Sequence, residues 1–201
     1  MASECEFIKI YNEYYQKVIR YLVRIVGAND AEDIAQEVFD KISQSLGGFR
    51  GNSKLSTWIY RIATNTAIDR LRSAGYKHST QHSTFEEATD LDGRNGLASH
   101  DHPATDQALI RKEMSECVRE FIGNLSPDYR TIIALSELEE LTNKEIADIL
   151  DISIENVKIR LHRARAKLKE SLNDGCDFYH NEQNVLFCDR KQSQILPKIP
   201  K

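Results

Sequence analysis

The chain has 201 residues, of which 40% are hydrophobic and 29% are charged, and a formal net charge of −4. This composition suits one or two small domains with real apolar cores. No apolar run approaches the ~20 residues of a transmembrane helix, which predicts no membrane insertion. The N-terminal residues Met1–Glu6 do not resemble a signal peptide, and the four cysteines are too scattered for a disulfide framework. We therefore expect a cytoplasmic protein with free or metal-bound thiols.

The slightly negative net charge hides two strongly basic segments. Basic residues gather in Arg50–Lys77 and Lys158–Lys169, whereas many acidic residues lie in Glu86–Asp106. Charges separated by more than about 8–10 Å are screened at physiological salt, so the local patch governs electrostatic affinity. The charge pattern is therefore compatible with a nucleic-acid partner.

The N-terminal third shows helical periodicity. Apolar residues at three- and four-residue steps predict a helix from Phe7 to Val26, a second from Asn29 or Asp30 to Gly47, and a third from Ser53 or Ser56 to about Arg72. No segment shows a convincing alternating strand pattern. The predicted fold class is all-α.

The third helix carries an unusual mixed face. Trp58, Arg61, Asn65, Asp69 and Arg72 follow one another at steps of three or four residues and so share one side, where Asp69 is expected to pair with Arg72 or Arg61. Aromatic rings stack on unpaired bases, amides hydrogen-bond base edges and guanidinium groups neutralise phosphates, a combination that suits single-stranded nucleic acid. Trp58 is equally well explained as a core side chain, and Asn65 as an ordinary polar residue of a helix.

A polar segment, Ser73–Asp106, separates this region from the next. It is rich in Ser, Thr, His, Asp and Gly and poor in large apolar residues, which predicts a flexible linker. It also contains His78, His82, His100 and His102. Because no cysteine or regular spacing completes a ligand shell, we interpret these histidines as linker residues rather than a metal site.

The C-terminal half predicts a helix-turn-helix. A helix over Gln107–Phe121 is followed by Ser126 and Pro127 at the start of another. Thr142 and Glu145 then form a capping box at the start of a short helix, and Ser153 can cap the helix after it.

The last of these helices is basic on one side and apolar on the other. Its apolar stripe is Val157, Leu161, Ala164, Leu168 and Leu172, and no acidic residue lies between Lys158 and Lys169. A basic amphipathic helix alone also suits a membrane surface. Placed directly after a short capped helix and a tight turn, it favours binding in a DNA major groove.

These motifs together resemble the sigma-70 family of bacterial sigma factors, and most closely its small extracytoplasmic-function (ECF) group. Segments Glu32–Phe39, Phe49–Gly51 and Thr57–Asn65 resemble region 2, and Leu125–Arg130, Glu145–Ala147 and Val157–Arg165 resemble region 4. The resemblance covers most of residues 7–172, in the family's order and spacing. It implies two small helical domains joined by a flexible linker, the C-terminal one a winged-helix-like four-helix domain with the helix-turn-helix.

The implied domains are region 2 over 1–76, a flexible linker over 77–107, region 4 over 108–172 and a tail over 173–201. The resemblance implies a non-catalytic promoter-recognition subunit with core RNA polymerase and promoter DNA as partners and an anti-sigma factor as a further candidate. Polymerase-docking positions are Asp33, Gln36 and Glu37. Positions for reading and melting the −10 element are Phe49, Arg50, Lys54, Trp58, Tyr60, Arg61, Asn65 and Arg72. Positions for reading the −35 element are Glu155, Asn156, Lys158, Ile159, Arg160 and Arg163.

The tail departs from the family pattern because it contains further cysteines. Cys176, His180 and Cys188 are candidate ligands for zinc or another metal, and the two cysteines are also a candidate redox pair. Their spacing matches no standard zinc motif, so we favour a passive docking extension and predict no cofactor.

Two other functions compete with the sigma-factor hypothesis. One is a stand-alone helix-turn-helix regulator with an N-terminal sensing domain, which would bind operators without polymerase. The other is an enzyme acting on nucleic acid, against which the sequence offers no metal-binding carboxylate cluster and no nucleophile with an obvious base.

Overall fold

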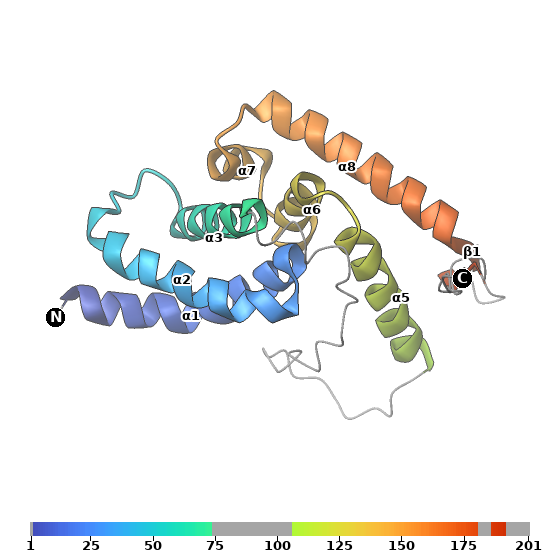
Figure 1. Cartoon of the computed structure of the whole chain (residues 1–201), viewed down its shortest axis with the longest axis horizontal. Helices are drawn as coiled ribbons and strands as arrows, with labels where there is room; N and C mark the ends of the chain where they lie inside the picture. Colours follow the sequence, from blue (N-terminus) through green and yellow to red (C-terminus); the bar gives the residue numbers. More distant parts are fainter. Residues whose placement is uncertain (1, 74–105, 181–185, 192–201) are drawn as a thin grey trace. The chain divides into compact units, whose positions relative to one another are not determined.

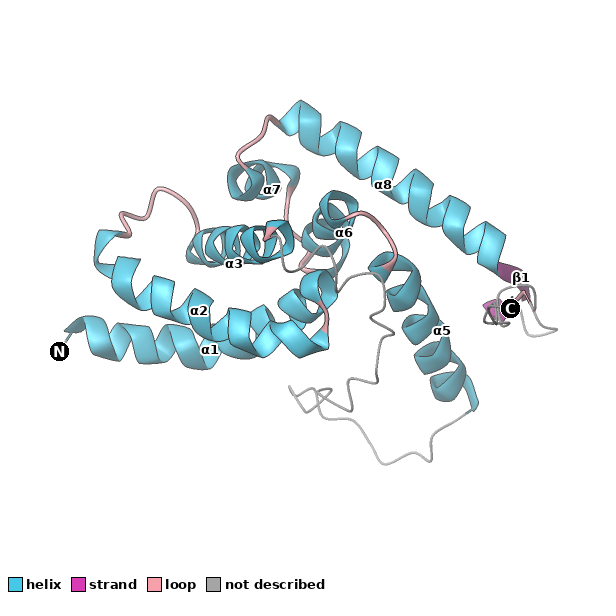
Figure 2. Ribbon diagram, in the orientation of Figure 1, coloured by secondary structure: helices cyan, strands magenta, loops and turns pink. Residues whose placement is uncertain are grey.

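The computed structural model describes residues 2–73, 106–180 and 186–191, which are mostly helical (Figures 1 and 2). The elements in chain order are α1 (Ala2–Val26), α2 (Ala28–Ser45), the 3₁₀ turn η1 (Leu46–Gly48), α3 (Leu55–Arg72), α5 (Asp106–Gly123), α6 (Pro127–Ile133), the π-helical segment η2 (Ala134–Leu138), α7 (Asn143–Leu150), α8 (Ile154–Gly175) and the strands β1 (Cys176–His180) and β2 (Leu186–Arg190). The predicted all-α class is confirmed. None of the described helices is both long and apolar enough to cross a membrane.

The described elements group into two compact units. The first combines α1, α2 and α3 with α6, η2, α7 and the part of α8 that ends at Ala164; the second contains α5, the rest of α8 and the two strands. The predicted linker boundaries at 77–107 stay predictions, because most of that segment lies outside the described residues. The histidines His78, His82, His100 and His102 lie outside them too.

The first unit is built on α1 and α2, which run side by side in opposite directions (Figure 1). Gly27, with φ of 90°, reverses the chain between them in a single residue. This backbone conformation favours glycine, and it lets α2 begin at Ala28 rather than at the predicted Asn29 or Asp30. The large side chains that are fully buried between α1, α2 and α3 include Leu22, Ile25, Ile34, Ile42 and Ile59.

A buried hydrogen bond joins α1 to α3 inside this core. The Tyr21 hydroxyl and the Thr64 hydroxyl lie 2.6 Å apart, and both residues are fully buried. The Tyr21 ring also meets the Tyr60 ring edge-on, with centroids 5.1 Å apart. Burial raises the pKa of Tyr21 far above its usual range, so the hydroxyl stays protonated.

The helix-turn-helix forms as the sequence predicts. Pro127 stands at the start of α6, and Thr142 and Glu145 form a complete capping box at the start of α7. Asp151 ends α7 in the left-handed conformation, and the Ser153 hydroxyl accepts a hydrogen bond from the Asn156 backbone at 3.2 Å. The start of α8 then buries its apolar stripe, Val157, Leu161 and Ala164.

The described residues include a small two-stranded sheet that the sequence did not predict. β1 and β2 form an antiparallel hairpin in which Cys176 pairs with Arg190 and Phe178 with Cys188. Each strand has five residues, and only Cys176 of β1 is buried. A strand that buries one residue has no alternating apolar pattern, which is why the sequence gives no signal for it.

We expect the Tyr21–Thr64 hydrogen bond to stabilise the first unit. Tyr21→Phe leaves a buried Thr64 hydroxyl without its partner, so the free energy of unfolding should fall by about 1–3 kcal/mol. The double variant Tyr21→Phe/Thr64→Val removes both polar groups and should recover part of that loss. Urea unfolding followed by circular dichroism measures both values. If the double variant has a lower free energy of unfolding than Tyr21→Phe, the two substitutions destabilise the protein independently. That result would contradict this account.

Candidate nucleic-acid interface

The mixed face of α3 is largely exposed, as its spacing suggests. Arg61, Asn65 and Arg72 are exposed, whereas Trp58 is half-buried and packs against Phe49 with ring centroids 5.1 Å apart. Trp58 thus combines both interpretations of the sequence: its indole has a packing partner but keeps part of its surface in solvent. Arg50 is also exposed, in the loop between η1 and α3.

The opposite face of α3 is fixed on α1 and α2. Ile59, Ala63 and Ala67 are fully buried there. Thr66 accepts a hydrogen bond from Lys41 of α2 at 3.1 Å and donates one to the backbone oxygen of Ile62 at 2.9 Å. This packing sets the rotation of α3 and so determines which side chains face solvent.

Tyr60, which the family resemblance gives as an aromatic neighbour of the −10 pocket, is buried in this structure. Only 4% of its surface is exposed, and its hydroxyl donates a hydrogen bond to the Glu139 carboxylate. Burial and the negative charge of Glu139 raise the pKa of Tyr60 well above its usual range. Tyr60 is therefore a packing residue in this arrangement. Like the neighbouring Ile59, it lies on the buried side of α3.

Two of the predicted DNA contacts are engaged by α7 of the same unit. The Lys54 ammonium lies 2.8 Å from the Glu145 carboxylate, and the Arg61 guanidinium donates to the backbone oxygen of Asp148. These contacts have no local signal in the sequence, since Arg61 and Asp148 lie 87 residues apart. The α3 face is thus partly covered by the helix-turn-helix.

The Glu145 carboxylate is held in its charged form. The hydrogen bond from Lys54, followed by those from the Thr142 hydroxyl and backbone, lowers its pKa to about 2. The Thr142 hydroxyl lies 2.7 Å from the carboxylate and the Thr142 backbone nitrogen 2.9 Å from it. Glu145 therefore joins the cap of α7 to α3 through one side chain.

The polar face of α2 projects away from the core. Asp33, Gln36 and Glu37 are all exposed, while Ile34 and Val38 on the other side are buried. Glu37 pairs with Lys41 one turn later at 2.7 Å. The three predicted docking residues thus form one accessible acidic and amide surface.

The first half of α8 exposes every residue predicted to read duplex DNA, namely Glu155, Asn156, Lys158, Ile159, Arg160 and Arg163. Ile159 is 48% exposed among these polar side chains. An exposed apolar group of this kind can contact a thymine methyl group in a major groove. Arg160 and Arg163 also line a shallow depression with Ser126, Asp128 and Tyr129.

Comparisons with known proteins identify the family of the chain. The family profile for sigma-70 region 2 matches residues 10–76, and that for sigma-70 region 4 matches residues 115–168. The ECF sigma factor SigW of Bacillus subtilis is 36% identical over 174 residues, which cover 84% of this chain and 89% of SigW. The sigma-H factor of Pseudomonas aeruginosa is 35% identical over 161 residues, covering 80% of this chain and 82% of that protein.

The chain belongs to the ECF group of the sigma-70 family. It is a sigma factor that directs promoter-specific transcription, and the competing hypothesis of a stand-alone regulator is not favoured. Sigma factors are initiation factors rather than enzymes.

Two solved structures share the fold. A sigma factor RpoE bound to the anti-sigma factor NepR, from Bartonella quintana, has a TM-score of 0.61 at 22% identity, covering 84% of this chain and 97% of that one. CnrH in complex with the cytosolic domain of CnrY has a TM-score of 0.55 at 21% identity, covering 85% of this chain and 90% of that one.

The cysteines of this sigma factor gather differently from the sequence hypothesis. Cys176 and Cys188 come together, but the third member of the cluster is Cys117 of α5, not His180. His180 stands four residues along β1 from Cys176, about 13 Å at the usual strand rise, and pairs with Leu186. The signal that was missed, Cys117, lies 59 residues before Cys176.

We expect the charge of Glu145 to stabilise the contact between α3 and α7 in a pH-dependent way. Glu145→Gln keeps the capping box, since Gln also suits that position, but removes the charge. The lowered pKa means that the carboxylate stabilises the fold above pH 4.5 and loses this effect as the pH falls toward 2. The variant should lose about 1 kcal/mol of unfolding free energy at pH 7, a modest value because Lys54 is exposed and screened.

Urea unfolding of the parent and of Glu145→Gln at pH 7 and pH 3 tests this expectation. The difference between the two proteins should shrink at pH 3. As a contrast, Thr142→Ala removes the hydroxyl cap and should destabilise α7 at pH 7 as well, by about 0.5–2 kcal/mol. The same difference between parent and Glu145→Gln at both pH values would rule out the charge effect.

Proposed function

We propose that this sigma factor divides promoter recognition among three surfaces. The polar face of α2 docks on core RNA polymerase, the exposed face of α3 reads and melts the −10 element, and the start of α8 reads the −35 element. The observation that carries this proposal is that each element has one face locked in the core and the opposite face exposed. Such rigid support keeps recognition side chains in position. The protein itself performs no catalysis and acts in the cytoplasm, where the polymerase carries out nucleotide addition.

The α3 face suits a base that has left the duplex. Asn65 offers an amide that can hydrogen-bond a base edge, and the Phe49–Trp58 pair offers an aromatic surface nearby in the chain. Extruding a base costs a few kcal/mol of unstacking, which contacts in a pocket must offset. Arg61 and Arg72 add positive charge for the flanking phosphates.

We expect Asn65→Ala to weaken promoter melting without weakening polymerase binding. The variant loses the amide contact with an extruded base, so the yield of open complex should fall on a matched promoter. Permanganate footprinting of the −10 region measures melting, and native gel shift with core polymerase measures binding. Asn12→Ala, an exposed asparagine of α1, is the matched control and should behave like the parent. An undiminished open-complex yield would remove Asn65 from the melting site.

The start of α8 suits the major groove of duplex DNA. Lys158, Arg160 and Arg163 are exposed on the side opposite to the buried Val157 and Leu161. Arginine commonly binds guanine in a bidentate manner, and both arginine and lysine neutralise phosphates. The helix therefore presents both positioning and base-reading groups.

Neutralising Arg163 should weaken promoter binding by the holoenzyme. If Arg163 contacts one phosphate, Arg163→Gln makes the log–log salt dependence of binding shallower by up to about one unit. If it reads a base, the variant loses about 1–3 kcal/mol of preference at one position of the −35 element. Fluorescence anisotropy with promoter DNA over a salt series distinguishes the two. Lys9→Gln, an exposed cation of α1, is the control. A variant with the parent's affinity, slope and sequence preference would exclude Arg163 from the interface.

The contact between α3 and α7 is proposed to be a resting arrangement. Lys54 and Arg61 cannot hold phosphates while they hold Glu145 and the Asp148 backbone. Ion pairs with an exposed partner are worth about 0–1 kcal/mol, so polymerase and DNA can displace these contacts at small cost. The two structural relatives are complexes with the anti-sigma factor NepR and with the cytosolic domain of CnrY. We extend that partnership to this chain, with an anti-sigma factor as the partner that would hold a resting form.

A further inference from the structure

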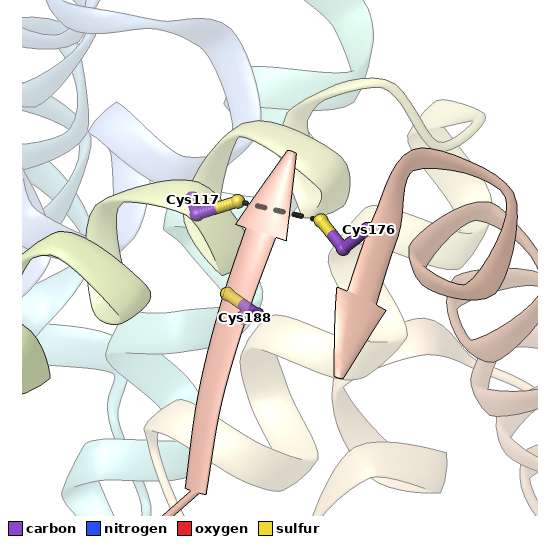
Figure 3. Close-up of side chains that lie close together, drawn as sticks. All are labelled: Cys117, Cys176 and Cys188. Atoms are coloured by element: carbon purple, nitrogen blue, oxygen red, sulfur yellow. Dashed lines mark hydrogen bonds between the residues drawn. The ribbon is translucent and has the colours of Figure 1, made fainter. Parts of the chain in front are cut away.

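Three cysteines converge in the second unit, outside the surfaces described above. Cys117 of α5, Cys176 of β1 and Cys188 of β2 point toward one another, and their sulfur atoms all lie within 4.8 Å of each other (Figure 3). The Sγ atoms of Cys117 and Cys176 are 3.9 Å apart. Cys176 is buried, with 2% of its surface exposed, and the other two are half-buried.

The hairpin register brings two of these thiols to one face. Cys176 lies opposite Arg190, and Cys188 lies opposite Phe178, two positions along β1. Residues two apart on a strand share a face, so Cys176 and Cys188 both project from the same side of the hairpin. The α5 helix supplies the third thiol on that side.

Several contacts independent of sulfur hold the hairpin in this position. Arg190 of β2 forms two hydrogen bonds with the Glu120 carboxylate, one turn after Cys117 on α5. The Lys191 backbone nitrogen donates to the Gly175 oxygen at 3.0 Å. A Cβ atom at Gly175 would lie 2.4 Å from the Phe121 ring, so a glycine at this position lets the end of α8 approach α5. The thiols are thus brought together by the surrounding framework.

We propose that Cys117, Cys176 and Cys188 form a binding site for a thiophilic divalent metal ion of the zinc class. Zinc–thiolate bonds are about 2.3 Å long, which places the sulfurs of a tetrahedral site about 3.8 Å apart. The 3.9 Å separation of Cys117 and Cys176 already meets this requirement. Cys188 reaches it with a side-chain adjustment of an ångström or less. The fourth coordination position is left for water or a small ligand, as in zinc sites with three protein ligands.

The charge balance of the cluster also suits a cation. A divalent ion displaces three protons and leaves one net negative charge on the complex. The Arg190 guanidinium, which is hydrogen-bonded to Glu120 one turn after Cys117, offsets part of that charge.

A metal ion explains the cluster better than a disulfide does. A disulfide uses two of the three thiols and leaves the third without a function, and its formation requires an oxidant. Coordination uses all three sulfurs. It also joins the C-terminal hairpin to α5, the helix in which the region 4 match begins. The bound metal should therefore stabilise the second unit, because it binds the folded arrangement and not the unfolded chain.

Metal titration of the full-length protein tests this site. The reduced, chelator-treated protein is titrated with Co²⁺, whose thiolate complexes absorb strongly in the near ultraviolet, and then with Zn²⁺ in competition. The parent should bind one equivalent. Cys117→Ser, Cys176→Ser and Cys188→Ser should each lower the affinity by at least about 100-fold, since even the loss of an outer-shell partner costs about 10–100-fold. Cys5→Ser removes the exposed cysteine of α1 and should leave binding unchanged.

Alkylation of the unmodified protein gives a second measurement that needs no variant to fold. Addition of Zn²⁺ should leave the rate at which iodoacetamide labels Cys5 unchanged. It should make the labelling of Cys117, Cys176 and Cys188 much slower than without Zn²⁺. No binding of Co²⁺ or Zn²⁺ by the parent, equal loss of binding in Cys5→Ser, or equal labelling of all four cysteines with and without Zn²⁺ would each overturn the proposal. A cluster that only forms a disulfide under oxidant and binds no metal would overturn it as well.

Discussion

The carboxylate of Glu139 ties together three separate parts of the first unit. It accepts a hydrogen bond from the Tyr60 hydroxyl of α3 and another from Arg24 of α1 at 3.1 Å. Glu139 itself directly follows η2, and only 12% of its side chain is exposed. A carboxylate so far removed from water is stable only while its partners are in place, so the three segments constrain one another. This constraint turns Tyr60 inward, and the exposed polar residues of α3 lie on the other side.

The same packing separates strong contacts from exchangeable ones. The apolar residues of α1, α2 and α3 form a continuous buried core. Opening this core would cost a large free energy, because it would expose apolar surface to water. The contacts of Lys54 and Arg61 with α7 are polar and lie at the surface. Partner binding can therefore exchange these contacts while the recognition helices keep their shape. This combination suits the proposed exchange of α7 for promoter DNA.

The sequence predicted what depends on local spacing. The capping box of Thr142 and Glu145, Pro127 at the start of α6 and the stripe of Val157, Leu161 and Ala164 each involve residues at most a few turns apart. Their physical causes, cap geometry and helical periodicity, are visible in the sequence itself. The order and spacing of these motifs also led to the correct family.

Features that depend on contacts between distant residues were missed. The burial of Tyr60 was not foreseen because it depends on Glu139, 79 residues later. Cys117 was not linked to the tail because the hairpin that brings Cys176 and Cys188 to it has no alternating pattern. The engagement of Lys54 by Glu145 likewise follows from how α3 and α7 pack.

The most direct test of the account is the distance between α3 and α7 in the free and polymerase-bound protein. Spin labels attached through non-natural residues at Asp69 of α3 and Lys144 of α7, both exposed, leave the native cysteines intact. Pulsed electron-spin distance measurements should give one short, narrow distribution for the free protein. Addition of core polymerase and promoter DNA should shift it to a clearly longer distance. An unchanged short distance in an active promoter complex would contradict the claim that α3 exchanges α7 for DNA.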